Sequence, residues 1–322
     1  MNGRPTVVVT RRLPSPVEER LRSLFDARLN TADAPLDEAA LAGAMRDADA
    51  LLPTVTDRIT AGLLGTPGRR VRIVSTFGVG FNNIDVAAAR ANGVIVTNTP
   101  DVLTDDTADL AITLVLMVAR RTGEGERLVR AGEWTGWRPT HMLGTRVTGK
   151  TLGLIGFGRI GRAVAARASG GFRMRVLWYD PFAAGDAASL GGERRASIEA
   201  VLQDSDFVSL HCPATPDTMH LMNAERLAAM RPGAFLINTA RGDVVDEAAL
   251  IHALRERTIA GAGLDVFEHE PSVSRELLDM DNVVLLPHLG SATEETRVAM
   301  GNRAVDNLAA FFDGGAPRDR VA

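Results

Sequence analysis

Three ionisable side chains in the second half of the chain each stand just beyond a short apolar stretch that predicts a strand. These are Arg241, Glu270 and His288. Ligands of open α/β sheets bind outside the carboxyl ends of the strands, so we expect the three side chains to converge. Singly, Arg241 fits a surface ion pair, Glu270 a solvated loop carboxylate and His288 the start of a helix. Together they predict an acid/base site.

A glycine-rich turn precedes these residues in the chain. The predicted strand at residues 151–155 runs directly into Gly156-Phe157-Gly158-Arg159-Ile160-Gly161. In such a turn the first glycine permits a tight bend, the second lets the backbone approach a pyrophosphate, and the third lets the next helix pack on the strand. The N-terminus of that helix offers N–H groups to phosphates, and Arg159 adds a positive charge. The pattern predicts a dinucleotide site.

An acidic residue follows the next predicted strand, as a dinucleotide site requires. Val176 to Tyr179 leads into Asp180, at about the spacing of the dinucleotide fingerprint. Its carboxylate would accept hydrogen bonds from the adenosine ribose and repel a 2'-phosphate, which predicts NAD(H) rather than NADP(H). The plain alternative is a turn residue before Pro181. Arg173 and Arg175 lie just upstream, so use of NADP(H) stays open.

The whole chain alternates predicted strands and helices in two series. Apolar strands that alternate with helices predict parallel sheets covered on both faces, and we expect an α/β protein with two doubly wound sheets. Long helices are predicted at residues 101–121 and 292–312. The strands are predicted near residues 5–10, 50–55, 71–76 and 94–98, and then near 151–156, 175–180, 207–211, 234–239, 261–266 and 283–287.

Composition narrows the class of protein. A length of 322 residues suggests two domains, and a formal net charge of -4 argues against a nucleic-acid or anionic lipid partner. The longest apolar run, residues 110–119, is half a membrane span, and no signal peptide is evident. Cys212 is the only cysteine, which favours a cytoplasmic location. The remaining histidines show no metal-ligand spacing, so we predict no metal.

Taken together, the motifs resemble the D-isomer-specific 2-hydroxyacid dehydrogenase family, most closely its glyoxylate and hydroxypyruvate reductase branch. The resemblance covers essentially the whole chain. It implies a Rossmann NAD-binding domain at residues 100–289, inserted into a flavodoxin-like substrate domain made of residues 1–99 and 290–322. The matching stretches are residues 77–85, 98–104, 156–161, 238–247 and 287–291.

The resemblance implies NAD(P)H-dependent reduction of a small 2-keto acid, glyoxylate or hydroxypyruvate, to the D-2-hydroxy acid. Arg241 would bind the substrate carboxylate, and a guanidinium matches a carboxylate with two parallel hydrogen bonds. His288 would exchange a proton with the substrate oxygen as acid and base, while Glu270 holds its imidazole. Backbone N–H groups at Val79 and Gly80 would share the carboxylate, although glycines there also fit a plain turn.

Further positions carry over from the family to the cofactor site and to a subunit contact. Asp265 is expected on the carboxamide side, and Thr107 equally fits an ordinary first-turn helix residue. The segment from Trp134 to Met142 resembles a loop that crosses to the partner's active site in a homodimer, with His141 where relatives can carry tryptophan. The residues expected to border the cofactor are the three glycines and Thr107, Arg159, Ile160, Asp180, Pro213, Thr218, Thr239, Asp265 and Ser291.

Rival functions were weighed on the same residues. An NAD-sensing binding protein similar to the family's transcriptional corepressors would keep a similar catalytic set. Phosphoglycerate dehydrogenases often carry a regulatory domain for which this chain has no room, but short versions exist, so a phosphoglycerate or other 2-hydroxyacid dehydrogenase stays an alternative. Glu270 argues against formate dehydrogenases, which have an amide there, and Val79 against phosphite dehydrogenases, which have a lysine. The preferred 2-keto acid and the reaction direction stay open.

Overall fold

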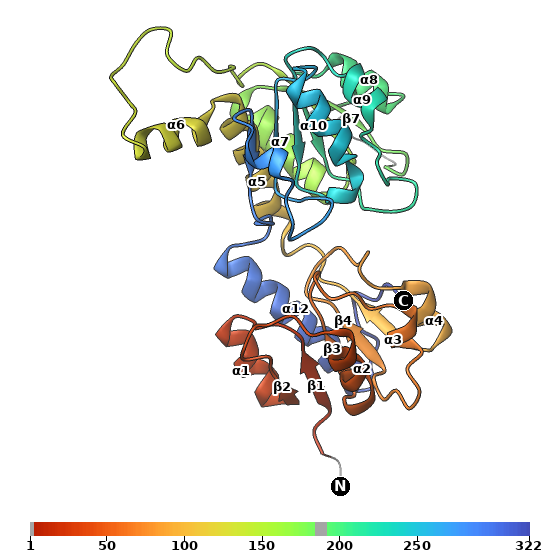
Figure 1. The fold of residues 1–322 in the computed structure, drawn as a ribbon. Helices are drawn as coiled ribbons and strands as arrows, with labels where there is room; N and C mark the ends of the chain where they lie inside the picture. Colours follow the sequence, from red (N-terminus) through yellow and green to blue (C-terminus); the bar gives the residue numbers. More distant parts are fainter. Residues whose placement is uncertain (1–2, 184–191) are drawn as a thin grey trace. The chain divides into compact units, whose positions relative to one another are not determined.

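The chain forms two compact units, each built on a parallel sheet. A computed structural model describes residues 3–183 and 192–322 (Figure 1). Unit 1 contains residues up to Leu103 and from Ser291 to Ala322, and unit 2 runs from Thr104 to Gly290. Within the described ranges, no helix is both long and apolar enough to cross a membrane. The predicted α/β class with two parallel sheets is confirmed.

The sheet of unit 1 has five parallel strands in the order β2-β1-β3-β4-β5, which is the flavodoxin-like order. Leu51, Val74 and Val96 point into a buried cluster with the helices on one face. The strands are β1 (Thr6–Val9), β2 (Asp26–Arg28), β3 (Ala50–Leu52), β4 (Ile73–Ser75) and β5 (Ile95–Thr97), and the helices on that face are α2 (Glu38–Asp47), α3 (Ala61–Leu64) and α4 (Val86–Ala91).

The opposite face of this sheet is covered by α1 (Ser15–Leu24) and by the last helix, α12 (Glu294–Phe312). Oγ of Ser75 donates to the carbonyl of Ala304 at 3.0 Å, which ties β4 to α12. A Cβ added at Gly301 would lie 2.5 Å from the Val17 side chain, so the two helices pack unusually closely. The end of the chain therefore completes the unit that its beginning starts.

The sheet of unit 2 has seven parallel strands in the order β12-β11-β10-β9-β6-β7-β8. Counted from β6, this is the Rossmann order with one strand added. The strands are added on one side of β6 up to β8 and on its other side from β9 onward, and such sheets bind dinucleotides at this change between β6 and β9. The strands are β6 (Thr151–Ile155), β7 (Arg175–Tyr179), β8 (Gly192–Arg194), β9 (Phe207–Leu210), β10 (Phe235–Asn238), β11 (Gly261–Leu264) and β12 (Val283–Leu285).

Both faces of this sheet are buried. Phe207 belongs to a core with α5 and α7, whereas the next residue, Val208, belongs to a core with α8, α9 and α10. Because successive residues of a strand face opposite sides, a doubly covered strand is largely apolar on both faces. The helices of unit 2 are α5 (Thr104–Ala119), α6 (Thr122–Arg130), α7 (Arg159–Phe172), α8 (Ile198–Asp204), α9 (Ala224–Ala229), α10 (Glu247–Arg255) and α11 (Arg275–Leu278), with a 3-10 turn, η2, at Gly242–Val244.

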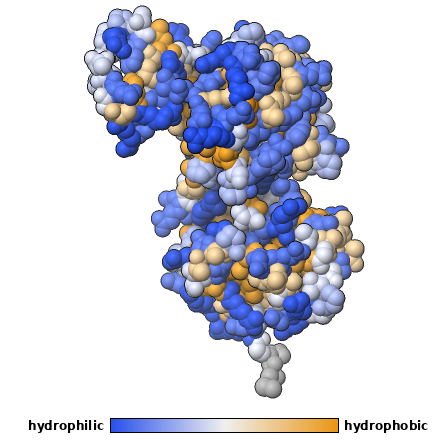
Figure 2. Space-filling view, in the orientation of Figure 1, coloured by the Kyte–Doolittle hydropathy of each residue, from blue (hydrophilic) through white to orange (hydrophobic). Residues whose placement is uncertain are grey.

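One segment of unit 2 leaves its core. Helix α6 has no buried residue, and it extends with residues 131–145 away from the sheet (Figure 1). We call residues 122–145 the arm. Hydrophobic residues interrupt its hydrophilic surface (Figure 2). Two of its large side chains are mostly exposed: Trp137 is 81% exposed and Leu143 is 68% exposed.

Candidate active site in the Rossmann unit

The glycine turn after β6 has the geometry that a pyrophosphate needs. Gly156 has φ +95°, and a Cβ there would lie 2.7 Å from the backbone after β9. A Cβ at Gly158 would meet nothing within 4 Å, so this side is open, whereas one at Gly161 would lie 2.4 Å from the Gly156 carbonyl oxygen. Helix α7 starts at Arg159 without a side-chain cap. The turn therefore fits a dinucleotide.

Asp180 lies at the end of β7 and is fixed against this turn. Its Oδ2 accepts the N–H of Phe157 at 2.8 Å, and its Oδ1 accepts the N–H groups of Phe182 at 2.8 Å and Ala183 at 3.0 Å. These three donors leave the carboxylate little freedom to turn away. It is hydrogen-bonded to the residue between the first two glycines of the turn, where the resemblance expects the ribose.

The turn after β9 closes the other side of the switch point. Oγ1 of Thr218 donates to the Pro213 carbonyl at 2.6 Å and accepts the N–H of Thr215 at 2.8 Å, so the predicted cofactor residues Pro213 and Thr218 form one small turn. Nε2 of the partly buried His211 lies 2.9 Å from Oγ of Ser209, and burial of the ring lowers the pKa of this histidine to about 4. His211 therefore stays neutral near pH 7.

Cys212 lies between this histidine and the turn. Burial raises the pKa of its thiol to about 11. A thiol of that kind carries almost no thiolate at neutral pH and is a poor nucleophile.

The three predicted catalytic residues leave neighbouring strands at the same edge. Asn238, Leu264 and Leu285 are in register across β10, β11 and β12, so the loops that follow begin side by side. Arg241 stands three residues after β10, and His288 three residues after β12. The carboxyl ends thus bring together residues that are far apart in sequence.

Asn238 shapes the loop that carries Arg241. Its Nδ2 donates to the Arg241 carbonyl at 2.8 Å, and its Oδ1 accepts the N–H of Ala240 at 3.0 Å. The guanidinium is partly buried and donates to the Ala240 carbonyl at 2.7 Å. Burial lowers its pKa, although the carboxylates of Glu270 and Asp243 oppose that shift. A carboxylate ligand here would meet a guanidinium that is poorly screened by water.

His288 and Glu270 form a hydrogen-bonded pair. Nδ1 of His288 lies 2.9 Å from Oε2 of Glu270, and Oε1 of Glu270 accepts the N–H of Phe267 at 3.1 Å. Burial opposes ionisation of Glu270, but the hydrogen bond and charge of His288, the Phe267 N–H and the charge of Arg241 outweigh it and lower the pKa of Glu270. The imidazole is 31% exposed, so its Nε2 can reach solvent or a ligand.

Asp265 positions the histidine. Its buried carboxylate accepts the N–H groups of Leu289 at 2.6 Å and Gly290 at 2.8 Å, and its carbonyl accepts the His288 N–H at 2.9 Å. His288 has φ +56°, a left-handed conformation that costs about 1 to 2 kcal/mol outside glycine. Three hydrogen bonds to one residue hold it there. Sequence reasoning gave Asp265 only a cofactor contact and missed this role.

The other predicted cofactor residues have distinct surroundings. Oγ1 of Thr107, in the first turn of α5, donates to the Gly290 carbonyl at 2.9 Å. Oγ1 of Thr239 is buried and has no hydrogen-bond partner among the described residues, as expected of a group that awaits a ligand. Ile160 packs partly buried in the first turn of α7, and Ser291 is the first residue of the chain's return to unit 1.

The predicted substrate loop belongs to unit 1. It follows β4, and its carbonyls are held from the segment after β5: Thr99 N–H donates to Gly78 at 3.0 Å, and Asn98 Nδ2 donates to Val79 at 2.8 Å. A Cβ at Gly78 would lie 3.0 Å from the Val55 side chain. Val79 and Gly80 are partly exposed at the carboxyl edge of their own sheet.

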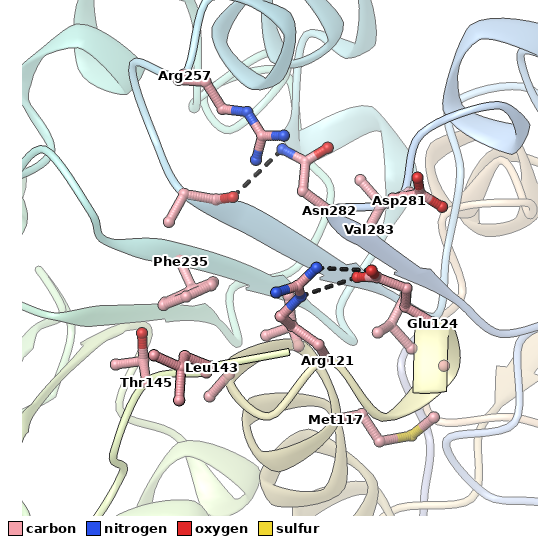
Figure 3. Close-up of a pocket in the computed structure, with 16 residues that line it drawn as sticks. Met117, Arg121, Glu124, Leu143, Thr145, Phe235, Arg257, Asp281, Asn282 and Val283 are labelled. Atoms are coloured by element: carbon pink, nitrogen blue, oxygen red, sulfur yellow. Dashed lines mark hydrogen bonds and ion pairs between the residues drawn. The ribbon is translucent and has the colours of Figure 1, made fainter. Parts of the chain in front are cut away.

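Unit 2 also has a pocket of about 410 Å³ that lies away from this chemistry. It is lined by Phe235 and Val283, which begin β10 and β12, and by Leu143 of the arm (Figure 3). Arg121 points to Glu124 across it and forms an ion pair at 2.6 Å. Because the amino ends of the strands lie opposite their carboxyl ends, this pocket is separate from the pair of His288 and Glu270. Among the described residues, no cluster could hold a metal ion.

A Rossmann sheet with an open glycine turn, followed by a histidine–carboxylate pair at its carboxyl edge, defines a dinucleotide-dependent dehydrogenase. Comparison with known sequences agrees. Residues 112–290 match the family profile described as D-isomer specific 2-hydroxyacid dehydrogenase, NAD binding domain. The chain is 44% identical to a glyoxylate reductase of Thermococcus litoralis, over 99% of this chain and 97% of that protein. The chain therefore belongs to the D-isomer specific 2-hydroxyacid dehydrogenase family, and it is an oxidoreductase.

Solved structures show the same relationship. A protein from Thermus thermophilus has a TM-score of 0.91 and 42% identity, over 98% of this chain and all of that one. An NADPH-dependent glyoxylate/hydroxypyruvate reductase from Sinorhizobium meliloti, in complex with NADP and malonate, has a TM-score of 0.88 and 38% identity, over 99% of this chain and 97% of that one. The family predicted from the motifs is thus confirmed.

Proposed function

We propose that this protein reduces a small 2-keto acid, glyoxylate or hydroxypyruvate, to the D-2-hydroxy acid with a nicotinamide cofactor. The observation that carries the proposal is the pair of His288 and Glu270, 2.9 Å apart, at the carboxyl edge of the sheet that carries the glycine turn. Relatives named glyoxylate reductase, at 44% and 45% identity over nearly the whole chain, support the choice of substrate.

The residues divide the reaction among them. NAD(P)H, when bound, supplies the hydride that reaches the carbonyl carbon. Ionised Glu270 accepts Nδ1–H of His288, which orients the imidazole ring, so that Nε2–H of the protonated ring donates a proton to the carbonyl oxygen. Arg241 binds the carboxylate with two parallel hydrogen bonds and sets the distance to both partners. One hydride and one proton together give the hydroxy acid, and the oxidation direction reverses both transfers.

We propose that the cofactor preference is NAD(H). Three backbone N–H groups hold the Asp180 carboxylate, so it cannot swing aside for a 2'-phosphate. The negative charge of the carboxylate would repel that of a 2'-phosphate bound beside it. The ratio of kcat/KM for NADH to that for NADPH tests this. We expect NADH to be preferred and Asp180→Ala to reduce the ratio by an order of magnitude or more, and a preference for NADPH in the wild type would contradict it.

The decisive assay follows NADH absorbance upon addition of glyoxylate, hydroxypyruvate, pyruvate or a bulkier 2-keto acid. We expect rapid oxidation with the two smallest acids. Replacing His288 by Ala should lower kcat by about 100- to 10,000-fold, the usual worth of a positioned proton donor, while NADH still binds. If the wild type binds NADH but turns over none of these acids, the NAD-sensing function gains support instead.

We propose that two copies assemble through the arm. Trp134 and Trp137 are exposed and belong to the residue type that is enriched at the energetic centre of interfaces, and the arm also lines the pocket at the amino ends of the strands. Sedimentation should show a dimer, and Trp137→Ser should weaken it. Leu278→Ser, on α11 and 54% exposed, is the matched control. An active wild-type monomer would contradict the assembly.

A further inference from the structure

A second histidine–carboxylate pair lies beside the catalytic one. Nε2 of His220 lies 2.7 Å from Oε1 of Glu268, although the two residues are far apart in sequence. Glu268 stands two residues before Glu270, on the turn that follows β11. Neither residue belongs to the predicted catalytic set, and the sequence analysis left His220 without a role.

Glu268 is also held by the start of helix α10. Its Oε2 accepts the N–H of Glu247 at 3.2 Å, and its own N–H donates to Oε2 of Glu247 at 3.3 Å. This reciprocal pair ties the turn to the first residue of the helix. Near a helix N-terminus a carboxylate is further stabilised by the helix dipole.

His220 is anchored on the opposite side. Its N–H donates to the Asp243 carbonyl at 2.8 Å, and it has φ +48°, a conformation that residues other than glycine rarely adopt. The hydrogen bond to Glu268 raises the pKa of His220, burial opposes this slightly, and the charges of Glu268, Asp246 and Asp243 add to the rise. The imidazole is therefore a bound donor rather than a free surface group.

The turn held in this way carries the catalytic carboxylate. Phe267 N–H donates to Oε1 of Glu270, and a Cβ at Gly242 would lie 1.9 Å from the backbone of Phe267, so the turn is pressed against the Arg241 loop. A change in the position of Glu268 must therefore move the Phe267–Glu270 turn. The distance between Glu270 and His288 changes with it.

We propose that His220 is a positioning residue for the reaction: through Glu268 it fixes the turn that keeps Glu270 within hydrogen-bond distance of His288. His220 makes no contact with Glu270, so its effect passes through the backbone. The inference rests on the proposed function only for its kinetic readout.

The test compares His220→Ala, His220→Gln and His269→Ala. Glutamine keeps an N–H donor for Glu268, and His269 is an exposed histidine on the same turn, which makes it the matched control. We expect His220→Ala to lower kcat by about 10- to 100-fold, the usual effect of removing a group that orients a functional side chain, with little change in KM. We expect His220→Gln to recover most of the loss and His269→Ala to resemble the wild type.

A readout without turnover separates this inference from the proposed function. Carboxyl ¹³C NMR follows the titration of Glu270, whose pKa should rise in His220→Ala because its hydrogen bond with His288 weakens, and the acid limb of kcat/KM should move to higher pH. An unchanged Glu270 titration and unchanged kcat in His220→Ala would overturn the inference, as would equal losses in the Ala and Gln variants. A wild type inactive on every 2-keto acid counts against the proposed function alone.

Discussion

Replacing Gly242 by alanine tests whether the loops that carry Arg241 and Glu270 depend on a direct backbone contact. The new Cβ would lie 1.9 Å from the carbonyl carbon and oxygen of Phe267 and 2.4 Å from the N of Glu268. Unbonded carbon atoms separate to about 3.5 Å, so the loops must part by roughly 1.6 Å. A displacement of about 1 Å at a reacting group can cost about 100-fold in rate. We therefore expect kcat/KM with glyoxylate to fall by about 100-fold or more.

The measurement is steady-state NADH oxidation beside thermal unfolding of the same samples. Overpacking a tight contact costs about 1 to 3 kcal/mol, so the variant should remain folded at the assay temperature. Gly170→Ala is the control, because a Cβ there meets nothing within 4 Å and alanine favours the helix. A Gly242→Ala enzyme with kcat/KM within about threefold of the wild type would refute the reasoning, since the loops would then tolerate separation.

Two further outcomes follow from the carboxylates. Asp265→Asn puts an amide N–H₂ where one oxygen accepted a backbone N–H from Leu289 or Gly290, so denaturant unfolding should show a loss of about 1 to 3 kcal/mol, and an unchanged midpoint would argue against these hydrogen bonds. The pKa of Glu270 is lower in the folded protein than its value of about 4.5 in the unfolded chain. Ionised Glu270 therefore stabilises the fold fully at pH values above 4.5, and this contribution is lost as the pH falls through the lower pKa of the folded state. The stability difference between the wild type and Glu270→Gln should therefore be constant at neutral pH and shrink in acid, and a difference that grows in acid would show the opposite sign.

Sequence patterns predicted the parts of the fold that are buried. Strands such as Phe207–Leu210 are apolar on both faces, and this signal survives without any knowledge of their neighbours. Strands β2 and β8 were not predicted, because Asp26–Arg28 and Gly192–Arg194 are short and largely exposed edge strands. The arm helix α6 was missed because it buries nothing.

The candidate site was also only partly predictable from the sequence. Arg241, Glu270 and His288 were predicted because each follows a strand and because the type of each side chain indicates its chemistry. Roles that depend on partners distant in sequence were not predicted, because no residue near His220 in sequence indicates that Glu268 is its partner. Such contacts are set by the packing of loops, and only coordinates show them.

The hydrogen bond from Thr107 to the Gly290 carbonyl joins the two ends of unit 2. A whole domain thus interrupts unit 1, and the first and last residues of this domain lie close together. For unit 1, the insertion is therefore equivalent to a short loop. Closing a long flexible loop costs entropy that grows with the length of the loop. In a folded inserted domain with adjacent ends, the packing of the domain's own core already offsets this entropy. Unit 1 can therefore fold without ordering a long flexible loop, and an inserted domain with adjacent ends can be gained or exchanged as a single piece.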